Sequence, residues 1–196
     1  MGAILSSLPR TVIAAFVLAL VVFIVITHGE VSQGTLLAAV RWLHVASGVM
    51  WIGLLWYFNF VQIPSMPKIP AEQKPAVSKV IAPAALFWFR WAAMATIILG
   101  LILAALNGTE YLTDAVSLGF STGHVSVIGI GMWLGTIMWF NVWFVIWPNQ
   151  KKALGITPVD ADATAKAARI GMLFSRTNTL LSVAMLMCMI GQSHPF

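Results

Sequence analysis

Two histidines within apolar segments are the residues of this sequence best suited to hold a cofactor. His44 lies between Leu43 and Val45 inside one hydrophobic run, and His124 lies near the outer end of another. A buried imidazole needs a partner for at least one ring nitrogen. Two imidazoles from facing helices are a usual pair of ligands to the iron of b-type haem. The alternative is a structural hydrogen bond at His44 and an interfacial position for His124.

A motif that occurs twice follows these histidines in the sequence, as Met50–Asn59 after His44 and as Met132–Asn141 after His124. It indicates that two helices are related by duplication. Each copy carries a tryptophan, Trp51 or Trp133, that could line a flat aromatic or macrocyclic ligand.

The other residues of the motif are expected to serve helix packing. Gly53 and Gly135 are predicted to allow close approach of another helix, and Gly131 stands one helical turn before Gly135. Asn59 and Asn141 need hydrogen-bond partners that lipid cannot supply. We expect these amides to bond to a neighbouring helix, and a substrate role is the alternative.

Two arginines in the intervening apolar runs are candidates for an anion site. Arg90 follows Phe89, and Arg176 stands in the string Ser175–Asn178. Either side chain alone could extend to lipid headgroups. Two at matching depth, with Asn178, Asn59 and Asn141, favour a site for an anionic substrate, a quinone or a haem propionate.

The composition places these residues in a membrane. Apolar residues make up 60% of the 196 residues and charged residues only 9%, with a mean hydropathy of +0.91. A soluble domain has about a quarter charged residues. Five runs are long enough to cross a bilayer, namely 11–27, 36–63, 84–106, 122–147 and 170–190. The sequence predicts an all-α integral membrane protein, with residues 1–196 as a single transmembrane domain.

The charged residues predict an orientation. Most lysines and arginines fall before the first run, between the second and third, or between the fourth and fifth. The positive-inside rule then places the N-terminus in the cytoplasm and the C-terminus in the periplasm of a bacterial inner membrane. This bias accounts for the net charge of +5, so no nucleic-acid partner is expected. His28 and His194 are expected to be solvated.

The repeat predicts the arrangement of the helices. The second and fourth runs point in the same direction, so the second with the third and the fourth with the fifth form two hairpins related by an axis along the membrane normal. We expect a four-helix bundle from these hairpins, with the first helix packed outside it.

Several long strings resemble one family. They are Trp42–His44, Trp51–Gln62, Phe89–Ala92, Gly131–Trp143, Ile146–Lys152 and Ser175–Ser182. They are similar, in the same order, to the membrane domain of the bacterial membrane-bound urate oxidase (urate hydroxylase) family. The resemblance implies oxidation of urate to 5-hydroxyisourate, with electrons passing to a c-type cytochrome domain at the C-terminus.

The sequence departs from that family pattern. Its single cysteine, Cys188, excludes a Cys-x-x-Cys-His haem attachment site within these residues. We therefore expect a short form that binds haem b through His44 and His124, oxidises urate or a similar planar anion, and passes electrons to a separate c-type cytochrome.

Two alternatives come from other classes of protein. The first is an accessory or electron-transfer subunit of a larger respiratory or photosynthetic membrane complex, without urate activity. The second is a metal permease that uses Met185, Met187, Cys188 and Met189, although consecutive residues point around a helix and favour core packing.

Overall fold

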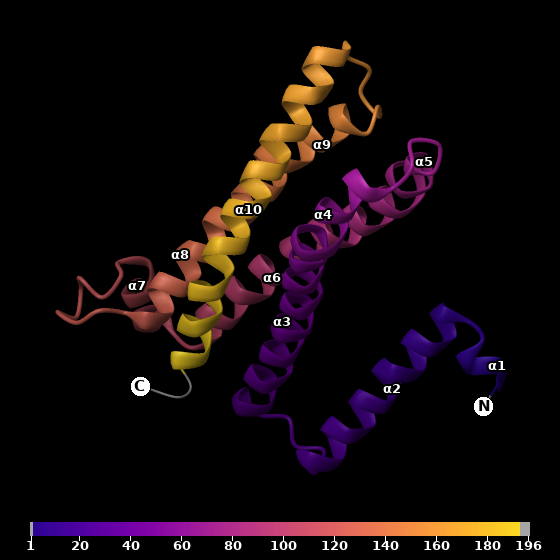
Figure 1. The fold of residues 1–196 in the computed structure, drawn as a ribbon. Coiled ribbons are helices and arrows are strands. Elements are labelled where there is room, and N and C mark those ends of the chain that lie inside the picture. The colour runs from indigo at the N-terminus through magenta and orange to yellow at the C-terminus, as the bar shows by residue number, and fades with distance from the viewer. Residues whose placement is uncertain (1, 193–196) are drawn as a thin grey trace. The chain divides into compact units, whose positions relative to one another are not determined.

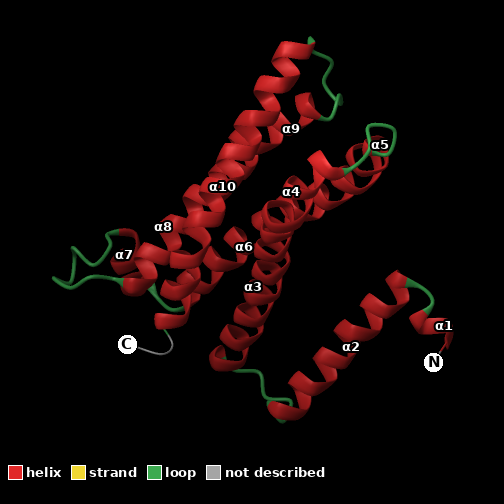
Figure 2. Ribbon diagram, viewed as in Figure 1, coloured by secondary structure: helices red, strands yellow, loops and turns green. Residues whose placement is uncertain are grey.

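The computed structural model describes residues 2–192, so His194 lies outside the described residues. These residues contain helices and connecting turns, with no strand among them (Figure 2). The short or irregular elements are α1 (Gly2–Leu5), η1 (Tyr57–Gln62), α4 (Ile63–Ser65), η2 (Met66–Lys68), α5 (Lys74–Ala76), η3 (Val77–Ile81), α7 (Thr109–Val116), η4 (Asn141–Ile146) and α9 (Trp147–Ala153). The long helices are α2 (Leu8–Ile26), α3 (Gln33–Trp56), α6 (Ala82–Leu106), α8 (Val127–Phe140) and α10 (Ala161–Gly191).

Five helical stretches are long and apolar enough to cross a membrane. They are Leu8–Ile26, Gln33–Lys68, Lys74–Leu106, Val127–Ala153 and Ala161–Gly191. The number of spans agrees with the five hydrophobic runs, but four of the stretches extend well beyond the predicted bounds. The fourth begins at Val127 rather than at Thr122.

The N-terminal unit covers residues 1–39 and is built around α2. The Arg10 side chain donates to the carbonyl of Ala3, and Thr11 Oγ1 donates to that of Ile4, which ties α1 to the start of α2. No residue of α2 is buried, and its apolar side chains face all sides. A helix that is apolar all round suits a lipid environment.

The second unit begins at Val40 and contains a helical bundle. Its core joins four segments through large buried side chains, among them Trp51, Leu55, Phe89, Met138 and Val142. In Figure 1, α8 and α10 run side by side in opposite directions. They lie close together at Gly131, where an added Cβ would lie 3.1 Å from Cys188 Cβ.

The two glycines of the motif do not allow the close approach of another helix that the sequence predicts at them. Gly53 is exposed, and Gly135 is buried, but an added Cβ at either residue would meet no atom within 4 Å. The two copies of the motif also present different faces to the core. Trp51 is 1% exposed and its counterpart Trp133 is 45% exposed. Phe58 and Phe140 differ in the same way.

The predicted bounds assume that helices end at prolines, and this assumption is wrong. Pro64, Pro83 and Pro148 each follow a π-helical segment, two residues after its last residue. A proline clashes with the carbonyl four residues before it. In all three cases that carbonyl lies inside the π segment. The wider turn accommodates the ring and lets the helix continue.

Gly129 offers a direct test of the packing of α8. An added Cβ there would lie 2.4 Å from the carbonyl oxygen of Ala115 in α7. We expect Gly129→Ala to lower the free energy of unfolding by about 1 to 3 kcal/mol, since backbone must move. Denaturant titration of the purified protein in mixed micelles measures this change.

Gly135→Ala is the matched control, because Gly135 is buried in the same helix but has open space around it. Its substitution should leave stability unchanged or raise it by up to about 1 kcal/mol through helix propensity. Equal losses in both variants would contradict the described packing of α7 on α8.

Candidate functional site

The asparagines of the repeated motif both donate hydrogen bonds to α10. Asn59 Nδ2 lies 2.8 Å from Ser175 Oγ, and Asn141 Nδ2 lies 2.8 Å from Asn178 Oδ1. Asn178 Nδ2 in turn donates to the carbonyl of Met138 at 2.9 Å. These are the cross-helix hydrogen bonds expected of amides at this depth. They join the two motif segments to one helix.

The α10 residues of this network belong to a polar stripe that the sequence patterns did not reveal as a whole. Ser175, Asn178 and Ser182 recur at helical spacing and all are buried. Ser182 Oγ accepts a hydrogen bond from Trp56 Nε1 at 3.0 Å and donates to the carbonyl of Thr179 at 2.7 Å. The spacing of small polar residues was the signal available for Ser182.

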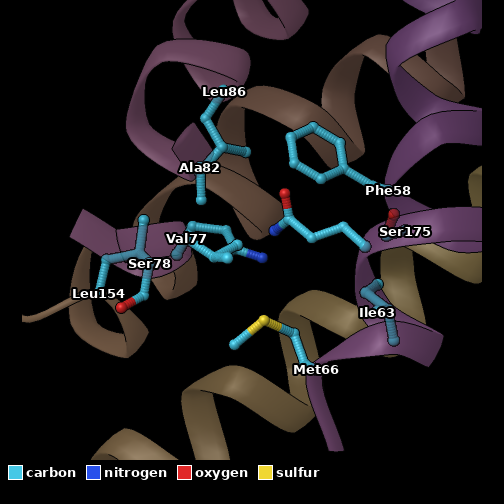
Figure 3. A pocket seen from close by; sticks show the side chains of 11 residues that line it. Phe58, Ile63, Met66, Val77, Ser78, Ala82, Leu86, Leu154 and Ser175 are labelled. Carbon is cyan, nitrogen blue, oxygen red and sulfur yellow. The ribbon is translucent and has the colours of Figure 1, made fainter. Parts of the chain in front are cut away.

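A cavity of about 100 Å³ lies beside this network (Figure 3). Its walls come from the end of the second long helical stretch, the start of the third, α9 and α10. The lining residues are Phe58, Gln62, Ile63, Met66, Val77, Ser78, Ala82, Leu86, Gln150, Leu154 and Ser175. Ser175 connects the cavity to the amide network, because its hydroxyl accepts from Asn59.

The chemistry of the cavity is apolar with a few neutral polar groups. Its polar side chains are Gln62, Ser78, Gln150 and Ser175, and no lining residue is ionisable. Gln62 Oε1 is buried without a hydrogen-bond partner, and so is Asn59 Oδ1 behind the wall. Such a cavity can bind and orient a polar planar molecule. Its own walls supply no general acid or base.

The glutamines of this cavity were missed at the level of sequence. Gln62 and Gln150 follow the two motif copies near the ends of long apolar runs, where polar residues are common at a membrane interface. Gln62 lies in the π-helical segment before Pro64, and Gln150 lies in α9, which continues the helix past Pro148.

The two arginines lie in different surroundings. The guanidinium carbon of Arg90 is 3.8 Å from the centre of the Trp147 ring and 5.2 Å from that of Trp143. Arg176 is exposed, and no hydrogen bond or ion pair ties it to another described residue. Neither arginine hydrogen-bonds to the amide network formed by Asn59, Asn141 and Asn178.

His44 is oriented by α6. Its Nδ1 lies 2.9 Å from the carbonyl oxygen of Thr96. Because a carbonyl only accepts, Nδ1 carries the proton and Nε2 keeps its lone pair. An added Cβ at Gly100 would lie 3.0 Å from Cε1 of the ring, so glycine leaves room for the imidazole. This arrangement fits a ligand to haem iron through Nε2.

His124 has a different setting from the one predicted. It is exposed in the turn that precedes α8. The helix starts late because Ser126 caps it, with its hydroxyl accepting from Gly129 N. Leu118, with a φ of 56°, helps to bend the chain before that point. His44 therefore makes the structural hydrogen bond of the alternative interpretation, and His124 lies in an exposed turn outside the helix.

The two tryptophans suggested for cofactor binding also differ in burial. Trp51 is buried in the core and its Nε1 has no partner. Trp133 is exposed and donates from Nε1 to the carbonyl of Val116 at 3.0 Å. His28 is exposed, as expected. Within residues 2–192, no group of three or more histidine, cysteine or acidic side chains is placed to hold a metal ion.

Asn178→Ala tests the amide network. We expect it to lower the free energy of unfolding by about 1 to 3 kcal/mol, because it leaves the buried Asn141 amide unpaired. Denaturant titration in mixed micelles gives the value. Thr177→Ala is the control, since Thr177 is exposed and bonds only within its own helix. If Asn141→Ala lowered the free energy of unfolding as much in the Asn178→Ala variant as in the unaltered protein, the two amides would not be coupled.

The turn that holds His124 should depend on pH through Asp114. Hydrogen bonds from Thr122 and Ser126 and, less strongly, the charge of His124 lower the pKa of Asp114. Because the pKa of Asp114 is lowered in the folded turn, its carboxylate stabilises the turn at pH values above the ordinary carboxyl pKa. This stabilisation is lost as the pH falls through the lowered pKa. At low pH, pepsin should therefore cleave residues 117–126 of the unaltered protein as fast as those of Asp114→Asn. At higher pH it should cleave the unaltered protein more slowly than the variant. A constant ratio between the two proteins would contradict this role.

Comparison with known proteins gives one family. Residues 115–196 match the family model described as urate oxidase N-terminal. No curated protein and no solved structure matches the chain. The matched segment includes α8, η4, α9 and α10, which supply Asn141, Gln150, Ser175 and Asn178. The C-terminal part of this helical chain, with its membrane-grade helices, is thus similar to the N-terminal domain of urate oxidase.

Proposed function

We propose that this chain is a membrane-embedded protein of the urate oxidase type and that the cavity beside the amide network binds urate or a similar planar molecule. One observation carries the proposal. The segment that matches the urate oxidase N-terminal family supplies Gln150, Leu154 and Ser175 to the cavity. The remaining walls come from the end of the second long helical stretch and from the start of the third.

The polar groups of the cavity suit such a ligand. Urate is flat and carries both N–H donors and carbonyl acceptors at its edge. The amides of Gln62 and Gln150 offer both kinds of partner, and the hydroxyl of Ser175 lies on the same wall. The unpartnered Gln62 Oε1 would accept from a ligand N–H. These residues bind and orient the ring, while the apolar walls exclude water.

Oxidation requires an electron acceptor, and haem b held by His44 is the proposed one. The support is the orientation of the ring, whose Nδ1 is fixed by Thr96 and whose Nε2 is left to coordinate iron. Haem would supply one-electron transfer. His124 is the proposed second ligand only if its turn moves toward the bundle. A separate c-type cytochrome would then receive the electrons.

Urate binding tests the cavity. Isothermal titration of urate into the protein in nanodiscs should show binding, and Gln62→Leu or Gln150→Leu should weaken it. A polar group left unpaired costs about 1 to 3 kcal/mol, which corresponds to about 5- to 150-fold in affinity.

The control for this experiment is Thr136→Ala, because Thr136 is exposed and its hydroxyl bonds only to Met132 in the same helix. It should bind urate as the unaltered protein does. The absence of urate binding, or equal binding by the glutamine variants, would overturn the assignment of this cavity.

A reduced-minus-oxidised optical spectrum tests haem separately. We expect a b-type band that is lost in His44→Ala, and the same measurement on His124→Ala decides whether that residue is the second ligand. Folded protein that shows no band after exposure to haem would overturn the redox proposal. Haem that urate does not reduce would favour an accessory or electron-transfer subunit over an enzyme.

A further inference from the structure

We infer that Arg90 and Lys151, which both lie close to the ring of Trp147, form a binding site for the phosphate of an anionic phospholipid. The site is separate from the cavity described above, because none of these three residues lines it. It joins α6 to α9.

The geometry brings two cations to one indole ring. The guanidinium carbon of Arg90 lies 3.8 Å from the centre of the Trp147 ring, and Lys151 Nζ lies 5.8 Å from it. Each cation is attracted to the π face. The two positive charges repel each other, however, and no carboxylate pairs with either of them among the described residues. An anion between or beside them would remove that repulsion.

The hydrogen-bonding groups of Arg90 are also left without acceptors. Contact with an aromatic face uses the flat side of a guanidinium, whereas its N–H bonds point outward in its plane. Arg90 donates no hydrogen bond to another described residue, and its enclosed Nε has no partner. Trp143, whose ring centre is 5.2 Å from the Arg90 guanidinium carbon, has an unpartnered Nε1. Positive charge and buried donors without acceptors therefore occur together at this site.

The surface around the site identifies a lipid as the source of the phosphate. Arg90 is partly exposed and stands beside exposed aromatic side chains of its own helix, Phe87, Trp88 and Trp91, which are 47 to 57% exposed. The Trp91 ring also contacts the Trp143 ring, with centres 5.4 Å apart. Acyl chains can cover this apolar surface while the headgroup reaches the cations. A soluble anion gains nothing from these aromatic side chains.

The position in the chain agrees with this assignment. Lys151 and Lys152 lie at the end of the fourth apolar stretch, where tryptophan and lysine commonly mark the boundary of a bilayer. Basic pockets between helices at such a boundary bind anionic headgroups.

Lipid retention tests the inference. The purified protein is stripped by detergent exchange and offered phosphatidylglycerol or phosphatidylcholine with the same acyl chains, and native mass spectrometry counts the bound lipids. We expect the unaltered protein to prefer phosphatidylglycerol. Arg90→Gln and Lys151→Gln should each reduce that preference about fivefold, the effect of about one basic residue near a headgroup.

Lys152→Gln is the matched control, because it removes the same charge from the neighbouring exposed residue. It should keep the preference. Arg90→Lys retains the charge and should keep most of the preference, so that a loss in Arg90→Gln is assigned to the missing charge. Equal binding of both lipids by the unaltered protein would overturn the inference, as would an equal loss in Lys151→Gln and Lys152→Gln.

A third arm separates the two sources of phosphate. Inorganic phosphate at millimolar concentration should not displace phosphatidylglycerol. Displacement by inorganic phosphate, together with equal retention of the two lipids, would assign the site to a soluble anion and overturn the lipid proposal.

Discussion

The bundle depends on one requirement, that every amide placed among apolar side chains must find a partner within the protein. Asn59 and Asn141 meet this requirement on the same helix, through Ser175 and Asn178. Since α10 has a single rotation that turns both groups toward the motif segments, these bonds fix its orientation. They also set the position of Ser175 in the cavity wall. The candidate binding site is therefore a by-product of satisfying buried polar groups.

Sequence patterns predicted the class of fold well because they report simple physical limits. Long apolar runs with few charges predict membrane-crossing helices, and five such stretches are present. The need of Asn59 for a cross-helix partner follows equally directly from its surroundings. Packing details were less accessible. Gly135 fits a small-residue pattern, yet the close approach of α10 occurs at Gly131, since spacing alone does not say which glycine meets a neighbour.

The site was harder to predict for two reasons. A repeat reveals common ancestry but not common burial: Trp51 is in the core and Trp133 on the surface, because each copy packs against different neighbours. His124 was assigned to a helix because apolar residues follow it, whereas the Ser126 cap starts the helix after it. Gln62 lies inside a predicted run, but the sequence does not show which face of the helix it presents, and the π segment Tyr57–Gln62 sets that face.

Those π turns have a consequence for alignment. Each contains one residue more per turn than the α-helix on either side, so the side chains beyond it are rotated by about 100° relative to those before it. In the second stretch this rotation separates the core residue Leu55 from the cavity residues Gln62 and Met66. An ungapped alignment that extrapolates α-helical periodicity through Tyr57–Gln62 assigns the wrong helical face to every residue up to Lys68. The direction in which these cavity side chains point thus depends on the number of residues in the π turn, not on which amino acids the turn contains.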